Sequence, residues 1–119
     1  MVQAHIRCVT FSGGVENTLE TSGHIDFNDA YTRVSFTTAD YGFSITVFDT
    51  YAEIAREGND AYRVLLLEGK TTPLESSLLK ADVHTHALKA KRTETAFSVM
   101  VHYALENEPI KLFVTATPQ

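Results

Sequence analysis

Two histidines separated by one residue, His84 and His86, are the most distinctive chemical feature of the sequence. On a β-strand, which rises about 3.3 Å per residue, they would point to the same face with their Cα atoms about 6.5–7 Å apart. Two imidazoles in this arrangement can bind zinc or iron when a third ligand joins them, and the candidates are His102, His24 and Glu94. The plainer interpretation is a pair of solvent-facing histidines on a polar strand face, because such short motifs often occur without a metal.

Two arginines, Arg56 and Arg63, form the second candidate site, because they flank a turn signal at residues 58–60. If segments 51–57 and 61–68 pair as a hairpin, both cations lie near its turn and can contact a ligand carboxylate or phosphate at the mouth of a barrel. The alternative is that they form exposed ion pairs with neighbouring carboxylates, each contributing about 0–1 kcal/mol.

Tyrosines form the third candidate set. In a barrel, some of their rings would line the interior with the hydroxyl near the rim, which orients a small amphipathic ligand, and Tyr31 and Tyr103 are the candidates for this role. The alternative is that these rings are core residues with one solvated end. The five tyrosines lie in separate segments of the chain: Tyr31, Tyr41, Tyr51, Tyr62 and Tyr103.

Signatures of other chemistry are missing from the sequence. There is no Gly-x-Ser-x-Gly nucleophile motif, and Gly13-Gly14 lacks the Lys and Ser/Thr of a phosphate-binding loop. Cys8 is the single cysteine, so neither an internal disulfide nor a Cys-based zinc cluster can form. We therefore expect a protein that is not an enzyme and uses no cofactor; the alternative is a metal-dependent enzyme that uses His84 and His86.

Length and charge limit the class of protein. The chain has 119 residues (13.2 kDa), a formal net charge of −5 and a pI near 5.4, which suits one domain over residues 1–119 and argues against a nucleic-acid partner. The longest aliphatic run, residues 64–67, is far shorter than the ~20 apolar residues of a membrane span, and residues 1–7 do not resemble a secretory signal. We expect a cytoplasmic protein with no membrane association.

Residue types and their alternation predict β-strands. The chain contains 15 Thr, 10 Val and 12 Phe or Tyr residues, all of which favour strands. Apolar residues recur at every second position near the end of the chain, so segments 95–105 and 110–117 are predicted to form a hairpin. Further strands are predicted at 3–11, 17–27, 31–37, 42–49 and 62–68.

Two segments fit either a helix or a strand. Residues 49–57 have a helix N-cap candidate in Asp49 or Thr50 and a stop signal in Gly58, yet they also suit a strand. Residues 77–90 contain helix-favouring Leu, Lys and Ala, yet alternate residues in them would share one face of a strand. An α+β fold with helices at 49–57 and 77–90 is therefore the alternative to an all-β fold.

Most of the chain resembles a known family. The motifs are Ile54-Ala55-Arg56-Glu57-Gly58, then residues 63–70, then Thr72-Pro73, and the later segments 85–88 and 101–105 keep similar spacings. From about Tyr31 onward, this pattern resembles the YwiB-like family of bacterial proteins of unknown function, whose members have a small calycin-type β-barrel. The resemblance implies strands at 51–57 and 82–88, and an all-β, closed or nearly closed antiparallel barrel of about eight strands that is calycin- or lipocalin-like.

A barrel of that size permits a binding role, because its interior is filled by side chains or holds one small ligand. We expect a small β-barrel that binds a small apolar or amphipathic molecule, or a protein partner. The alternative is a structural or homodimeric protein whose barrel interior is packed throughout.

Overall fold

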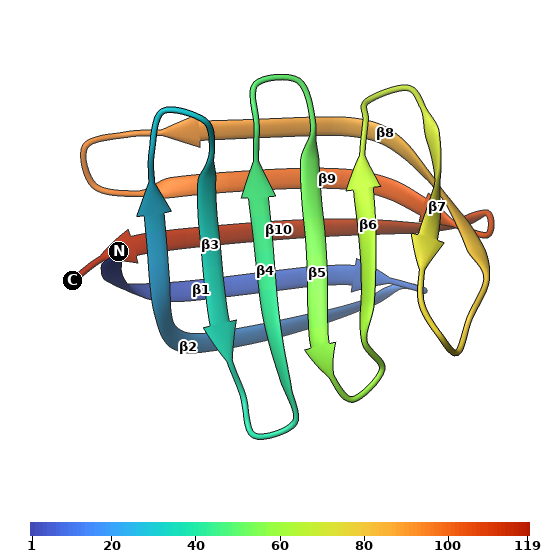
Figure 1. Cartoon of the computed structure of the whole chain (residues 1–119), viewed down its shortest axis with the longest axis horizontal. Coiled ribbons are helices and arrows are strands. Elements are labelled where there is room, and N and C mark those ends of the chain that lie inside the picture. The colour runs from blue at the N-terminus through green and yellow to red at the C-terminus, as the bar shows by residue number, and fades with distance from the viewer.

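Ten antiparallel strands form one closed barrel in the computed structural model, which describes residues 1–119 (Figure 1). Each strand pairs with its neighbours in chain order, and the last strand pairs with the first. Because every strand has a partner on both sides, the sheet has no open edge. The strands are β1 (Val2–Ser12), β2 (Val15–Phe27), β3 (Thr32–Thr37), β4 (Tyr41–Val47), β5 (Ala52–Gly58), β6 (Tyr62–Leu66), β7 (Thr71–Glu75), β8 (Ala81–Arg92), β9 (Phe97–Leu105) and β10 (Glu108–Pro118).

The barrel is flattened into two layers whose strands run in different directions. Figure 1 shows β3 to β7 lying across β8, β9, β10, β1 and β2. The two long strands β2 and β8 connect the layers, since β2 pairs with both β1 and β3 and β8 pairs with both β7 and β9. These strands must therefore bend where the layers meet.

Each connecting strand bends at an identifiable place. In β2, a Cβ atom added to Gly23 would overlap the carbonyl oxygen of Ser35 and the Cδ1 atom of Ile6, so only glycine allows β3 to approach this closely. In β8, the register with β9 shifts between Thr85 and Ala87. Such a bulge bends and twists the strand, which lets β8 leave β7 and continue along β9.

Aliphatic side chains pack one end of the barrel. Ala4 and Ile6 of β1 and Val114 and Ala116 of β10 point inward and are almost completely buried. They belong to a cluster of 17 buried hydrophobic residues contributed by strands of both layers. Burial of these side chains supplies the main driving force for folding, at about 25 cal/mol per Å² of apolar surface.

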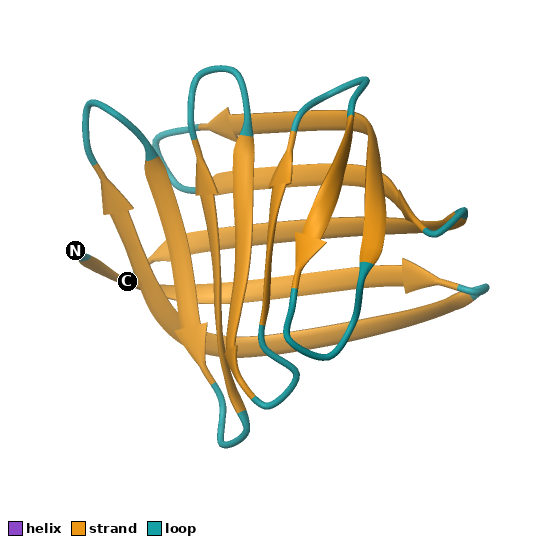
Figure 2. Cartoon of the chain, turned by 45° about the vertical axis from the view of Figure 1, so that its right-hand side comes forward, coloured by secondary structure: helices purple, strands orange, loops and turns teal.

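The all-β, closed, antiparallel barrel predicted from the sequence is confirmed, but the predicted number of strands is wrong. The barrel has ten strands, not about eight. The strand that the sequence analysis did not predict is β7, which contains Pro73, a residue without an amide donor. The alternative with helices at 49–57 and 77–90 is also wrong, because strands and loops account for the whole chain in Figure 2.

The close approach at Gly23 predicts the effect of substitution there. Gly23→Ala should lower the free energy of unfolding by about 1–3 kcal/mol, because the added methyl group has no space and must displace the backbone of β3. Urea denaturation followed by circular dichroism measures this. Gly42→Ala is the matched control, since the nearest atom to its added Cβ would be Thr37 Oγ1 at 3.9 Å; equal stability of the two variants would contradict the assigned role of Gly23.

Candidate functional site

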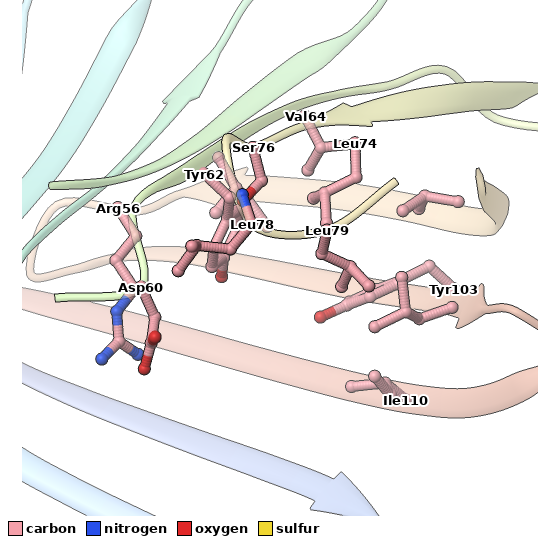
Figure 3. A pocket seen from close by; sticks show the side chains of 13 residues that line it. Arg56, Asp60, Tyr62, Val64, Leu74, Ser76, Leu78, Leu79, Tyr103 and Ile110 are labelled. Atoms are coloured by element: carbon pink, nitrogen blue, oxygen red, sulfur yellow. The ribbon is translucent and has the colours of Figure 1, made fainter. Parts of the chain in front are cut away.

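The barrel interior is hollow at the end away from the packed aliphatic side chains. Two chambers, of about 420 Å³ and about 280 Å³, lie within it. Ile54, Arg56, Tyr62 and Tyr103 line both chambers, so the two adjoin. Figure 3 shows the larger chamber, whose walls are mostly aliphatic and aromatic side chains. The interior is thus packed at one end and open to a small molecule at the other.

The hairpin of β5 and β6 positions the main polar groups of the cavity. Arg56 lies directly opposite Tyr62 in the register of these strands. Directly opposed residues project from the same face of a sheet, so the alternation that buries Ile54 and Val64 also points Arg56 and Tyr62 inward. Tyr103 reaches the cavity from β9 in the other layer.

The Arg56 guanidinium is held from two sides. Its Nε donates a hydrogen bond of 2.9 Å to the carbonyl oxygen of Asn59 in the β5–β6 turn. Its Cζ lies 4.0 Å from the centroid of the Tyr41 ring, a cation–π contact. Asp60 also lines the larger chamber, but no carboxylate oxygen of the protein lies within 4.0 Å of an Arg56 nitrogen.

Burial raises the pKa values of three groups that line the chambers, Tyr103, Tyr62 and Cys8. It raises the pKa of Tyr103, and the nearby Tyr62 and Cys8 raise it further. Burial also raises the pKa of Tyr62, against a smaller lowering by the positive charge of Arg56. The pKa of the Cys8 thiol is raised by burial as well, with a smaller opposing effect of its hydrogen bond with Thr10. Arg56 and Asp60 are therefore the charged residues that line the two chambers at pH 7.

Two leucines of the β7–β8 loop border the larger chamber. Leu78 and Leu79 line it, yet 77% and 51% of their surfaces are exposed. Sequence reasoning missed them because it treated residues 77–90 as one helix or one strand. The structure instead places these residues in a loop ahead of β8, where they add apolar surface next to the mouth of the chamber.

The structure separates the four predicted ligand-binding residues. Arg56 and Tyr103 line the same cavity. Arg63 points outward from β6, where its Nε lies 3.6 Å from Glu53 Oε1. Tyr31 packs against Phe48 with ring centroids 5.6 Å apart and does not line either chamber. Sequence reasoning did not select Tyr62 or Cys8, although the predicted hairpin register would have paired Tyr62 with Arg56.

The predicted histidine pair lies on the outer face of the barrel. The rings of His84 and His86 are 4.7 Å apart, and that of His102 is 5.2 Å from His86. His84 Nδ1 is hydrogen-bonded to the Thr71 hydroxyl at 2.9 Å. No group of three His, Cys, Asp or Glu side chains is arranged to hold a metal ion. Metal binding by His84 and His86 stays a prediction, and it would lie outside the cavity.

The other two suggested third ligands are not in this histidine cluster. His24 lies on β2 and Glu94 in the turn between β8 and β9.

No helix of the structure is long and apolar enough to cross a membrane.

Comparisons with known proteins identify the fold. A scan against protein-family models and a search of curated proteins found no match. Among solved structures, the chain is similar to the YwiB protein from Bacillus subtilis, with a TM-score of 0.76 and 13% sequence identity. The match covers 99% of this chain and 91% of that one. The protein therefore has a YwiB-like fold.

The raised tyrosine pKa values predict a loss of stability at alkaline pH. The folded protein keeps protons on Tyr62 and Tyr103 that the unfolded chain loses near pH 10, so the free energy of unfolding should fall as the pH rises above about 10. Urea denaturation across this pH range measures the slope. The Tyr62→Phe/Tyr103→Phe double variant should show a shallower slope, and an unchanged slope would refute the burial of these hydroxyls.

Proposed function

We propose that the protein binds a small, largely apolar molecule in the hollow end of its barrel and performs no chemistry on it. The observation that carries this proposal is the larger chamber, whose volume of about 420 Å³ falls in the range of small-molecule sites. Protein interiors are normally packed as densely as organic crystals, so a hollow half beside a fully packed half favours a bound molecule over a structural role with a solid interior.

The lining residues support binding rather than catalysis. Neither chamber is lined by a histidine or a glutamate, and Asp60 is the one carboxylate among the lining residues, so no pair of acid–base groups faces the cavity. Cys8 is the nucleophile candidate, but burial raises the pKa of its thiol and reduces the reactive thiolate. The cavity thus offers apolar surface and hydrogen bonds without an activated nucleophile.

Finer features of the sequence-based hypothesis belong to this proposal. A calycin- or lipocalin-like relationship is supported by strands that follow one another in chain order around a ligand-sized interior. A cytoplasmic location is supported by the single cysteine, which needs no oxidising compartment. The second candidate function is binding of a protein partner or a second copy of the chain. It is supported by Leu78, an exposed apolar residue at the mouth of the cavity.

A pair of tryptophan variants tests whether the cavity is the binding site. Ile110 of β10 faces the larger chamber, whereas its neighbour Lys111 is exposed on the outside. The neutral apolar dye N-phenyl-1-naphthylamine should bind the wild-type protein with enhanced fluorescence. Ile110→Trp should weaken this binding at least tenfold by filling the chamber, while Lys111→Trp should change it less than twofold. Absence of dye binding to the wild type, or equal effects of the two variants, would overturn the proposal.

The chemical reactivity of Cys8 provides a second test. It is the only cysteine of the chain and lines the smaller chamber. Alkylation by iodoacetamide at pH 8 should be slower in the folded protein than in urea, because burial raises the pKa of the thiol. Saturating N-phenyl-1-naphthylamine should slow it at least threefold further. A rate that does not respond to bound dye would place the dye outside the smaller chamber.

A further inference from the structure

Arg56 is the feature of the cavity that an entirely apolar ligand would leave unexplained. It is the one cation lining the two chambers. No carboxylate oxygen lies within 4.0 Å of an Arg56 nitrogen, although the chain has five more acidic than basic residues. A cation kept in a mostly apolar cavity without a paired carboxylate favours an anion from outside the protein.

We propose that the bound molecule is an amphipathic anion, whose carboxylate or similar head pairs with Arg56 while its aliphatic tail fills the larger chamber. This inference rests on the proposed function and adds the charge and orientation of the ligand. Leu74, Leu105 and Ile110 supply aliphatic walls for the tail. The leucines of the β7–β8 loop continue this surface to the mouth of the chamber.

The bonds of Arg56 leave its anion-binding edge free. Nε is used by the Asn59 carbonyl, and one face of the guanidinium is covered by the Tyr41 ring. The two terminal nitrogens donate no hydrogen bond within the protein. Two such nitrogens match the spacing of carboxylate oxygens and can bind them in a bidentate manner. The guanidinium is therefore oriented before a ligand arrives.

The hydroxyl groups around Arg56 suit the same head group. Tyr62 is its direct cross-strand neighbour, and Tyr103 lines both chambers with it. Because both phenols stay protonated at pH 7, they can donate hydrogen bonds to an anion instead of repelling it. The apolar walls strengthen these electrostatic interactions by excluding water.

Asp60 is a competitor for the guanidinium. It lines the larger chamber together with Arg56, and its carboxylate forms no close ion pair with any residue. An anionic head that approaches Arg56 also approaches this negative charge. Neutralising Asp60 should therefore strengthen anion binding, which is the opposite of the effect expected for Arg56.

Three probes built on a ten-carbon chain test the inference: decanoate, decan-1-ol and decyltrimethylammonium. Each is measured by displacement of N-phenyl-1-naphthylamine below its critical micelle concentration. Decanoate should bind wild-type protein at least tenfold more tightly than decan-1-ol, and the cationic probe should bind most weakly. Arg56→Gln should bring decanoate to the level of decan-1-ol while changing decan-1-ol less than twofold. Asp60→Asn should tighten decanoate binding severalfold.

Arg63→Gln is the matched control, because it removes the same charge from the neighbouring strand outside the barrel. It should leave decanoate affinity unchanged. If decan-1-ol binds the wild type as tightly as decanoate, or if Arg56→Gln and Arg63→Gln weaken decanoate equally, the anion inference fails while cavity binding stands. If the dye and all three probes fail to bind, the proposed function fails as well. Retained binding of decan-1-ol shows that a variant is folded.

Discussion

The pairing of the first strand with the last is the interaction on which the rest of the structure depends. β1 and β10 are joined in an antiparallel ladder from Ala4 opposite Pro118 to Ser12 opposite Ile110. This ladder joins the two ends of the chain and encloses an interior that an open sheet of the same strands would expose. Both the packed end and the hollow end exist because of it, since β1 and β10 contribute side chains to each.

The number of strands explains why the interior is only partly filled. The diameter of a barrel grows with its strand number, and about eight strands leave space that side chains just fill. Ten strands enclose more space than that. At the packed end, the two layers bring Ile6, Ile25, Ile45 and Leu66 into one cluster. At the other end, side chains that include Cys8, Tyr41 and Tyr62 surround the smaller chamber without filling it.

Strands whose formation depends on nearby residues could be predicted from the sequence, whereas features that depend on distant parts of the fold could not. Strands such as 97–105 could be read from alternation, because each inward residue is apolar and burial decides the pattern. β7 could not be predicted in this way. Pro73 is unfavourable in a strand, and β7 is stabilised by its pairing with β6 and β8 on either side. The run Val64-Leu65-Leu66-Leu67 concealed which face is inward, so sequence reasoning could not separate inward Arg56 from outward Arg63. The place of Leu78 depends on the path of the β7–β8 loop, which no local pattern encodes.

The division of the barrel into two ends resolves a conflict between stability and binding. A charged side chain in an enclosed apolar space destabilises a fold unless polar groups satisfy it. Arg56 lies near the end of strand β5, where the Asn59 carbonyl and the Tyr41 ring partly satisfy its charge. Buried side chains at the other end, such as Ala4, Ile6 and Ala116, supply stability that does not depend on these contacts. Because Arg56 is already oriented, an incoming anion would order few protein groups, and affinity would then depend mainly on how well its tail fills the chamber.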